Sequence, residues 1–395
     1  MGYSTPYIVL NIIFLILSVL SFASKKESTQ KQWALLSAIV FIVFFAFRGY
    51  VQTDTLNYYN LFERLPSIFT QFPDEPDYDT GFLVYMSIIK SIGFSYNHFI
   101  FISSVIDLIL LTILFRQYFS YKYYAFYFYI FLIFTGFEYE FNLMRNIKSV
   151  LLFLISIKYI YSRDFVKFLV LNLIGLTFHW SSIVFIPVYF FIHKELSLRV
   201  LCVFFFIGIS IYFLMPYLLH PMLKFISNIF QGFTFVEKIE TYLELKKYSM
   251  GKKFGLVDII SIIWYLLMLI SYNRIKETSS YSICFVNLFV ICFMFSCMSS
   301  GMVIFRQRVA VLFEPAAWVL FVWILKAQND FKNKLFVFSM IALFGLLIPL
   351  RRFKNDILYE YDNILLNENI ISIEERTERF QKIKLDKEKE LNNKK

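Results

Sequence analysis

Long apolar runs separated by short polar segments occupy most of the first 350 residues. Crossing the hydrocarbon core of a membrane takes about 20 apolar residues in a helix, and these runs approach that length. The pattern therefore predicts an all-α polytopic membrane protein with about 12 transmembrane helices. The predicted spans are Tyr7–Phe22, Trp33–Phe47, 98–115, 123–137, 145–161, two short spans within Phe168–Ile192, 200–219, 256–273, 281–299, 309–325 and 335–350.

Residues 1–350 are predicted to form the transmembrane domain. The polar segments predict on which side of the membrane each of its loops lies. Lysines between the first two spans mark a cytoplasmic loop, so the stretch 48–80 is expected to be the first outer loop. The apolar segment Gly81–Gly93 is short and is predicted to be an interfacial helix in that loop. Residues 220–256 are expected to form a second outer loop, and residues 351–395 a charged C-terminal tail.

The run Phe168–Ile192 has two interpretations. It contains no Lys, Arg, Asp or Glu, and His179 lies near its middle. A single long span would place 220–256 and the tail in the cytoplasm, as the bias of basic residues toward the cytoplasm prefers. A hairpin of two short spans turning at His179–Ser182 would place both outside. Charge counting does not decide between them.

Composition excludes a water-soluble globular protein. Apolar residues make up 58% of the chain and charged residues 17%, against about 45–50% and 25% in soluble domains. The basic residues behind the net charge of +10 lie in short loops, where they indicate which side of the membrane each loop faces. The charge therefore predicts no nucleic-acid partner. No phosphate-binding loop or metal-ligand spacing occurs, so neither a cofactor nor a metal is expected. The four cysteines lie in apolar runs and indicate nothing about disulfides: Cys202, Cys284, Cys292 and Cys297.

Arginines are expected to collect at the outer membrane face under the hairpin interpretation. Guanidinium groups bind phosphate through paired charge-assisted hydrogen bonds, so a converging set suits a lipid-linked phosphate or pyrophosphate. The alternative is that each side chain reaches toward lipid headgroups. The residues in question are Arg48, Arg145, Arg306, Arg308, Arg351 and Arg352.

Asp54 follows Arg48 in the first outer loop. The spacing of Asp54, Tyr58 and Phe62 predicts that they share one face of a helix. A carboxylate beside aromatic rings suits glycosyl transfer, because it can deprotonate a sugar hydroxyl while the rings stack on the sugar. The alternative is that Thr53 or Asp54 caps the helix.

Three further polar positions lie near or within the predicted spans. His179 sits in a deeply apolar run, where an ionisable group is a functional candidate, although a neutral ring bonded to Ser181 or Ser182 would explain it equally well. Arg145 begins a predicted helix, with Glu138 and Glu140 as possible salt partners just before it. Asp107 is predicted either to pair with a nearby cation, such as Lys148 on the face of Arg145, or to belong to a buried polar site.

These residues together resemble a known family. The motifs are Arg48-x5-Asp54-x3-Tyr58, Asn142-x2-Arg145 and Phe178-His179-Trp180-Ser181-Ser182, followed by Ile186-Pro187-Val188-Tyr189. Further matches are Asp79-x-Gly81, Arg308 with Leu312-Phe313, Ile348-Pro349 and Tyr359. In this order they resemble the EpsG family of Wzy-type bacterial polysaccharide polymerases. The chain departs from the family pattern at Gln52, where the family often has Gly, and at Asn146, where it commonly has Gln.

The resemblance implies a membrane glycosyltransferase of GT-C-like architecture in the bacterial cytoplasmic membrane. Such polymerases join undecaprenyl-pyrophosphate-linked oligosaccharide repeat units at the outer face, for capsule, O-antigen (lipopolysaccharide) or exopolysaccharide. The implied partners are the lipid-linked oligosaccharide, membrane lipids, and chain-length regulator and flippase proteins. Neither a nucleotide nor a metal is implied.

The resemblance also suggests roles for individual residues. Asp54 would be the first candidate for the base and His179 the second. The pyrophosphate would be held by Arg48, Arg145 and Arg308, with Arg306 a weaker candidate, and Tyr58 and Tyr59 would contact sugar. Alternatives are a glycan ligase using the same donor, a flippase or exporter of lipid-linked oligosaccharide, and a non-catalytic assembly factor. Polar candidates at one face favour an enzyme over a flippase.

Overall fold

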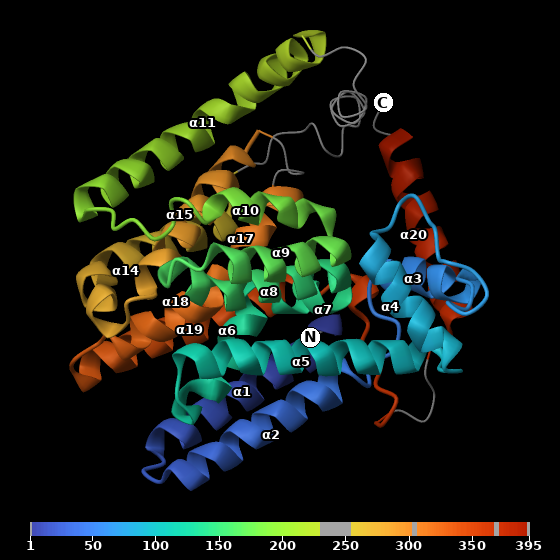
Figure 1. Cartoon of the computed structure of the whole chain (residues 1–395), viewed down its shortest axis with the longest axis horizontal. Helices are drawn as coiled ribbons and strands as arrows, with labels where there is room; N and C mark the ends of the chain where they lie inside the picture. The colour runs from blue at the N-terminus through green and yellow to red at the C-terminus, as the bar shows by residue number, and fades with distance from the viewer. Residues whose placement is uncertain (1, 230–253, 302–305, 367–370, 393–395) are drawn as a thin grey trace. The chain divides into compact units, whose positions relative to one another are not determined.

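The structure, a computed structural model, describes residues 2–229, 254–301, 306–366 and 371–392 (Figure 1). These residues form helices, and the β-pairing among them is one isolated bridge between Arg48 and Asn363. The chain divides into two compact units. The first comprises residues 1–156, 166–183 and 339–395, and the second comprises residues 157–165 and 184–338.

Several helices run mainly through the first unit. They are η1 (Gly2–Ser4), α1 (Thr5–Ala23), α2 (Glu27–Phe45), α3 (Thr53–Arg64), α4 (Thr80–Ser91), α5 (Tyr96–Tyr118), η2 (Tyr121–Tyr123), α6 (Tyr124–Phe131), η3 (Leu132–Gly136), α7 (Phe137–Phe141), α8 (Met144–Tyr161), α9 (Phe165–Phe178), η4 (Trp180–Val184), α19 (Phe331–Arg352), η6 (Ile357–Tyr359) and α20 (Ile373–Asn392). Those of the second unit are α10 (Phe185–Val188), α11 (Leu198–Ile229), α14 (Leu256–Thr278), α15 (Ser282–Met298), η5 (Arg306–Ala310), α17 (Val311–Phe313) and α18 (Ala316–Lys326).

Apolar length identifies the membrane helices. Six helices of the described chain are long and apolar enough to cross a membrane: Gly2–Ala23, Glu27–Phe45, Tyr96–Tyr118, Leu198–Leu218, Leu256–Thr278 and Phe331–Arg352. Three shorter apolar helices are Phe165–Phe178, Ser282–Met298 and Ala316–Lys326. The chain is therefore an all-helical polytopic membrane protein, as the sequence predicts. The total of 12 spans stays a prediction.

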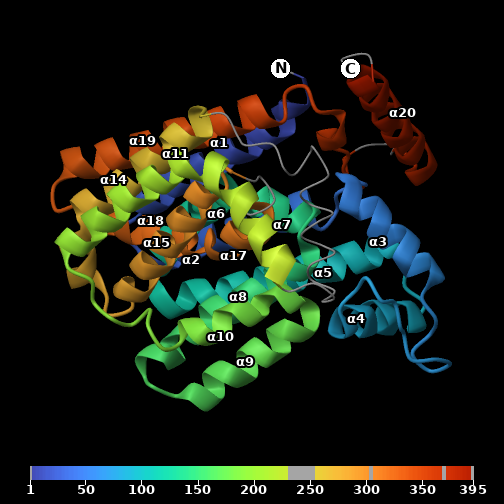
Figure 2. The same ribbon diagram turned by 90° about the horizontal axis from the view of Figure 1, so that it is seen from above.

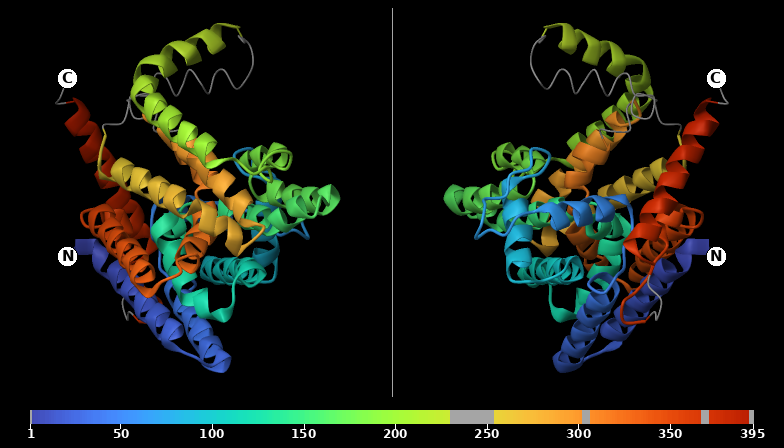
Figure 3. Two further views of the ribbon diagram at one scale, coloured as in Figure 1. Left: turned by 90° about the vertical axis from the view of Figure 1, so that its left-hand side faces the viewer. Right: turned by 90° about the vertical axis from the view of Figure 1, so that its right-hand side faces the viewer.

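In the first unit, apolar helix faces pack against one another. α1 packs against α2 and α6, and α2 also packs against α5. The paired α1 and α2 are visible in both views of Figure 3. Aromatic side chains fill these contacts: the rings of Phe14 and Phe128 are stacked with centroids 5.5 Å apart, and Phe41 also lies 5.5 Å from Phe128.

The segment between α2 and α5, which includes the predicted first outer loop, contains two short helices, α3 and α4, which pack with the start of α5 (Figure 2). The predicted interfacial helix is α4. Phe62 of α3, Phe82 of α4 and Phe99 of α5 belong to one buried cluster. The i, i+4 spacing explains this packing, since Tyr58 and Phe62 lie on the same buried face of α3.

The predicted span 123–137 is a broken helix. Phe134 and Thr135 leave the helical conformation, and Thr135 has a φ of 61°. The chain continues through the short helix α7, which carries Glu138 and Glu140. An unbroken helix would carry these carboxylates in a different direction, so the break determines which partners they meet.

The segment around His179 reverses direction. α9 ends at Phe178, and the helical segments between it and Ile192, η4 and α10, are short. The ring of Tyr189 then lies 4.9 Å from the ring of Phe165 at the beginning of α9. This reversal excludes one straight helix across Phe168–Ile192 and has the geometry of the hairpin. The side of the membrane that the turn faces stays a prediction.

In the second unit, α15 packs against α11, α14 and α18. α11 is longer than the predicted span, because residues 220–229 continue it. The predicted outer loop 220–256 therefore begins as helix. Residues 230–253 of that loop lie outside the described part of the chain.

The C-terminal segment is attached to the predicted first outer loop. The N–H of Gln52 donates to the carbonyl of Leu358, and the N–H of Gly49 donates to that of Asp362. The amide of Asn363 also donates to the carbonyl of Val43. Beyond this segment α20 packs against α3 (Figure 2). The expected tail is thus folded onto the outer loop as far as α20.

Candidate functional site

Asp79, which directly precedes α4, joins three parts of the first unit. Its Oδ2 accepts a hydrogen bond from Nη1 of Arg145 at 2.9 Å and lies 3.4 Å from Nδ1 of His179. Its Oδ1 accepts from the backbone N–H of Trp180 at 2.9 Å. The three charged or titratable side chains are 12–19% exposed. Asp79 therefore holds a cation and an imidazole together at a partly open surface.

His179 lies between a carboxylate and a hydroxyl. The ionised carboxylate of Asp79 can only accept, so Nδ1 of His179 carries the proton. In the neutral ring Nε2 is then an acceptor, and the hydroxyl of Ser181 donates to it at 2.5 Å. The arrangement provides a basic lone pair that already faces an O–H group. Of the two serines considered as partners, Ser181 makes this contact.

Arg145, at the start of α8, is held by aromatic rings as well as by Asp79. Its Nε donates to the hydroxyl of Tyr58 at 3.3 Å, and its guanidinium lies 5.0 Å from the ring centre of Tyr78. A cation above an aromatic face is stabilised by the ring's negative face. These contacts fix the position of the guanidinium while leaving part of it accessible.

Two glycines allow the helices of the site to approach closely. A Cβ at Gly81 of α4 would overlap the side chain of Thr177 on α9. A Cβ at Gly175 of α9 would lie 3.2 Å from Cα of Ser149 on α8. Because α9 approaches both helices, Asp79, Arg145 and His179 meet although they are far apart in sequence.

The environment of Asp79 keeps its carboxyl ionised. Burial would raise its pKa, but the hydrogen bonds from His179 and from the N–H of Trp180, together with the charge of Arg145, outweigh burial and hold the pKa below its usual value. The shift favours the charged form that His179 needs for its orientation.

Asp54 lies beside this cluster. It is in the first turn of α3, where a carboxylate is favoured by the helix dipole, and its Oδ1 lies 3.5 Å from the amide nitrogen of Asn57. It occurs one helical turn before Tyr58. Burial raises the pKa of Tyr78, Arg145 opposes that rise, and the charge of Asp54 adds to it. Gln52, rather than Thr53 or Asp54, occupies the cap position, and its side chain makes no capping hydrogen bond.

The two tyrosines predicted to contact sugar occupy different environments. Tyr58 is 3% exposed, and its ring packs 5.2 Å from Phe82. Tyr59 is half-buried and lies 5.5 Å from Tyr96. Tyr58 is thus placed to hold Arg145, whereas Tyr59 keeps part of its ring accessible. Their contact with sugar stays a prediction.

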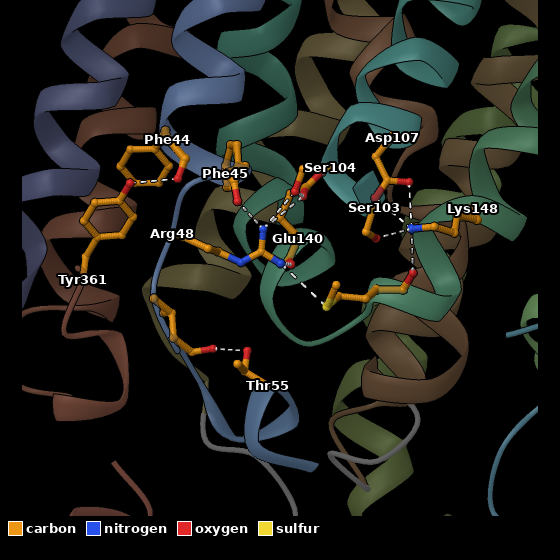
Figure 4. A network of polar contacts seen from close by, with 12 residues as sticks. Phe44, Phe45, Arg48, Thr55, Ser103, Ser104, Asp107, Glu140, Lys148 and Tyr361 are labelled. Carbon is orange, nitrogen blue, oxygen red and sulfur yellow. Dashed lines mark hydrogen bonds and ion pairs between the residues drawn. The ribbon is translucent and has the colours of Figure 1, made fainter. Parts of the chain in front are cut away.

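Arg48 is enclosed by protein (Figure 4). Its Nη1 donates to the carbonyl of Phe45 at 2.6 Å and to Ser104 at 3.0 Å, and its Nη2 donates to the carbonyl of Glu140 at 2.5 Å. Its side chain is 0% exposed. This placement favours a structural role, in which Arg48 ties α2, α5 and α7 together. Its contact with pyrophosphate stays an untested prediction.

A second buried ion pair lies beside Arg48 (Figure 4). Nζ of Lys148 lies 3.0 Å from Oδ2 of Asp107, and it donates to Ser103 at 2.8 Å and to the carbonyl of Met144 at 3.2 Å. Of the alternatives for Asp107, the structure shows the paired one. Because Lys148 bonds the carbonyl next to Arg145, the pair supports the start of α8.

Glu138 forms a neighbouring polar cluster. It accepts from Arg352 at 2.5 Å and from the amide of Asn142 at 2.7 Å. That amide nitrogen also lies 3.4 Å from Oε1 of Gln52. Glu138 and Glu140 are therefore ion-pair partners of Arg352 and Arg48, and Asp79 forms an ion pair with Arg145.

The remaining arginines are more exposed. Arg351 is exposed at the end of α19. Arg308 is exposed in the second unit, and Arg306 lines a cavity of about 500 Å³ there together with Tyr212 and Asp258. Their contact with pyrophosphate stays a prediction.

The sequence does not identify Asp79, Ser181 or Trp180 as site residues. Its signal for Asp79 is the Asp79-x-Gly81 match, and for Ser181 it is the possible hydrogen bond to His179. Trp180 is 63% exposed, and its backbone N–H contacts the carboxylate.

The fold and the site define a polytopic membrane protein with a carboxylate–imidazole–hydroxyl chain beside a fixed arginine. The family model of the EpsG family matches residues 31–363, so the chain belongs to that family. This confirms the resemblance and indicates a membrane protein of the polysaccharide-polymerase type. No curated protein matches the chain. No solved structure matches it either.

Proposed function

We propose that this protein polymerises undecaprenyl-pyrophosphate-linked oligosaccharide repeat units at the extracytoplasmic face of the bacterial cytoplasmic membrane. Membership of the EpsG family supports this proposal. The observation that carries it is the Asp79–His179–Ser181 chain beside Arg145. Glycosyl transfer from a lipid pyrophosphate requires a base for the incoming hydroxyl and positive charge for the leaving group, and the site offers both.

The proposed reaction balances with two substrates. A sugar hydroxyl oxygen of the incoming repeat unit forms a bond to C1 of the sugar at the reducing end of the growing chain. The bond from C1 to the pyrophosphate oxygen breaks, and its electron pair leaves with undecaprenyl pyrophosphate. The hydroxyl proton goes to the base.

His179 is proposed as that base, because its Nε2 faces a hydroxyl and its Nδ1 is held by Asp79. The Ser181 hydroxyl marks the place of the acceptor hydroxyl. Arg145 is proposed to bind the pyrophosphate, since its fixed guanidinium needs little reorganisation. Arg306 and Arg308 are proposed pyrophosphate ligands on the basis of the resemblance alone.

The direct test is polymerisation by the purified protein. In lipid nanodiscs with lipid-linked repeat units and no nucleotide sugar, we expect a ladder of products on a gel. Transfer of a single finished glycan to another lipid without a ladder would instead indicate a ligase. Movement of the substrate between leaflets without new linkages would indicate a flippase, and either result would contradict the proposal.

Asp54 is proposed to bind the acceptor sugar through its hydroxyls. Asp54→Asn is therefore expected to raise KM for the repeat unit about 10–100-fold, the cost of one charge-assisted hydrogen bond, with kcat changed less. Initial rates of the first linkage measure both constants. Glu63→Gln, on the exposed side of the same helix, is the control. Loss of kcat at unchanged KM would restore Asp54 as the base.

A further inference from the structure

A partly open cavity lies in the first unit where α20 meets the start of α3. Its wall includes Tyr50, Gln52, Leu56, Arg376, Arg379 and Phe380. Pockets that bind small molecules combine apolar walls with a few directed polar groups. Gln52 and Leu56 of this wall flank Asp54, the proposed acceptor-binding residue, in sequence.

Two buried donors in this wall have no acceptor in the described part of the chain. Gln52 is 8% exposed, and its Nε2 makes no hydrogen bond. Arg376 is 7% exposed, and its Nε makes none. A buried N–H group without an acceptor costs free energy, so nearly all such groups in proteins are bonded. Both side chains line one cavity, and a ligand rich in acceptor oxygens would satisfy them.

The backbone of Gln52 is strained. Its φ and ψ are 69° and 169°, a region that is essentially restricted to glycine. Residues held in such conformations cluster at ligand-binding and active sites. Oε1 of Gln52 accepts a hydrogen bond from the amide of Asn142 at 3.4 Å. Nε2 of Gln52 has no hydrogen-bond partner in the described part of the chain.

α20 is fixed in place by ion pairs. Arg376 donates to Asp362 at 3.0 Å and to the carbonyl of Glu360 at 2.7 Å, and Arg379 donates to Glu360 at 2.5 Å. Arg379 also donates to Glu375. Three carboxylates thus face two guanidinium groups, which disfavours an anionic ligand. The family match ends at residue 363, so α20 adds this wall outside the matched region.

We propose that this cavity binds a neutral sugar residue of the acceptor glycan, with Gln52 Nε2 and Arg376 Nε donating to its oxygens. An acetamido group fits this donor pair best, because its carbonyl is a strong acceptor. Tyr50 and Phe380 provide the aromatic walls on which sugar rings pack. Assigning the sugar to the acceptor rests on the proposed polymerase function, whereas the binding itself does not.

Saturation-transfer NMR on the full-length protein in nanodiscs tests the site with two probes, methyl N-acetylglucosaminide and methyl glucuronide. We expect transfer to the first probe, with affinity about tenfold lower in Gln52→Gly, the loss of one hydrogen bond. Gln52→Gly also relieves the backbone strain, so its melting temperature should equal or exceed that of the wild type. Phe380→Ala should weaken binding independently. Glu378→Gln, exposed on α20, is the control.

Unchanged affinity in both Gln52→Gly and Phe380→Ala, or no transfer to the wild type, would overturn the site. Stronger transfer to the glucuronide would overturn the neutral-sugar assignment. Asp79→Asn, expected to be inactive in polymerisation, should bind the probe normally. If no ladder forms while probe binding still depends on Gln52 and Phe380, the polymerase proposal is contradicted and the sugar-binding site is supported.

Discussion

Asp79→Asn is expected to lower kcat for linkage formation about 10³–10⁴-fold, with KM for the repeat unit changed far less. The asparagine amide can donate to Nδ1 of His179, which favours the tautomer with its proton on Nε2. That tautomer has no lone pair facing the acceptor hydroxyl, so the base is lost although the imidazole remains. Initial rates of the first linkage, with protein in nanodiscs, measure the effect.

Asp77→Asn is the matched control for this substitution. Asp77 lies in the same loop with an exposed side chain, and only its backbone carbonyl contacts Arg145. Combining Asp79→Asn with His179→Ala should cost little more than either alone, because two residues acting as one unit are not additive. Additive losses would separate Asp79 from His179 and contradict the proposed base.

The lowered pKa of Asp79 determines what a pH profile reports. A carboxyl whose pKa is lower in the folded protein stabilises the fold above its unfolded pKa, and this stabilisation is lost as pH falls through the folded pKa. Asp79 therefore stays ionised at neutral pH. A change of rate near neutral pH would therefore not report the titration of Asp79.

Hydropathy predicts where the helices lie, because crossing a membrane restricts length and composition together. It does not predict the break at Thr135, since the segment around it is continuously apolar. It also leaves the turn at His179 ambiguous. There the reversal depends on contacts such as Phe165 with Tyr189, which local composition does not specify.

The site was only partly predictable for a related reason. Charge at span ends identifies both Arg48 and Arg145, yet one is enclosed and the other is 19% exposed. Burial depends on neighbours from distant segments, such as Glu140 for Arg48. Asp79 has several acidic neighbours in its loop, and only contacts across 66 and 100 residues distinguish it from them.

The family departure at Gln52 becomes understandable in the same way. The resemblance leads us to expect Gly there, and the φ of 69° is the conformation that Gly adopts without strain. The sequence shows the substitution but not the backbone that makes it costly. The structure shows both the strained backbone and the cavity that the Gln52 side chain lines.

Lys148→Met is expected to destabilise the protein by about 3–5 kcal/mol, because it leaves the carboxylate of Asp107 buried without its cation. Both side chains are 2% exposed, so water cannot replace the lost partner. The bond from Lys148 to the carbonyl of Met144 is lost as well, which should loosen the start of α8 and with it Arg145. Thermal unfolding in detergent, monitored by near-UV circular dichroism, measures the change in stability.

The double variant Asp107→Leu/Lys148→Met separates the buried charge from the shape of the site. Replacing a whole buried ion pair by apolar side chains is often neutral, so most of the lost stability should return. If activity returns with it, the pair serves folding alone. If stability returns while KM for the donor stays raised, the bond to Met144 also positions Arg145. A single Lys148→Met variant as stable as the wild type would contradict the buried pairing itself.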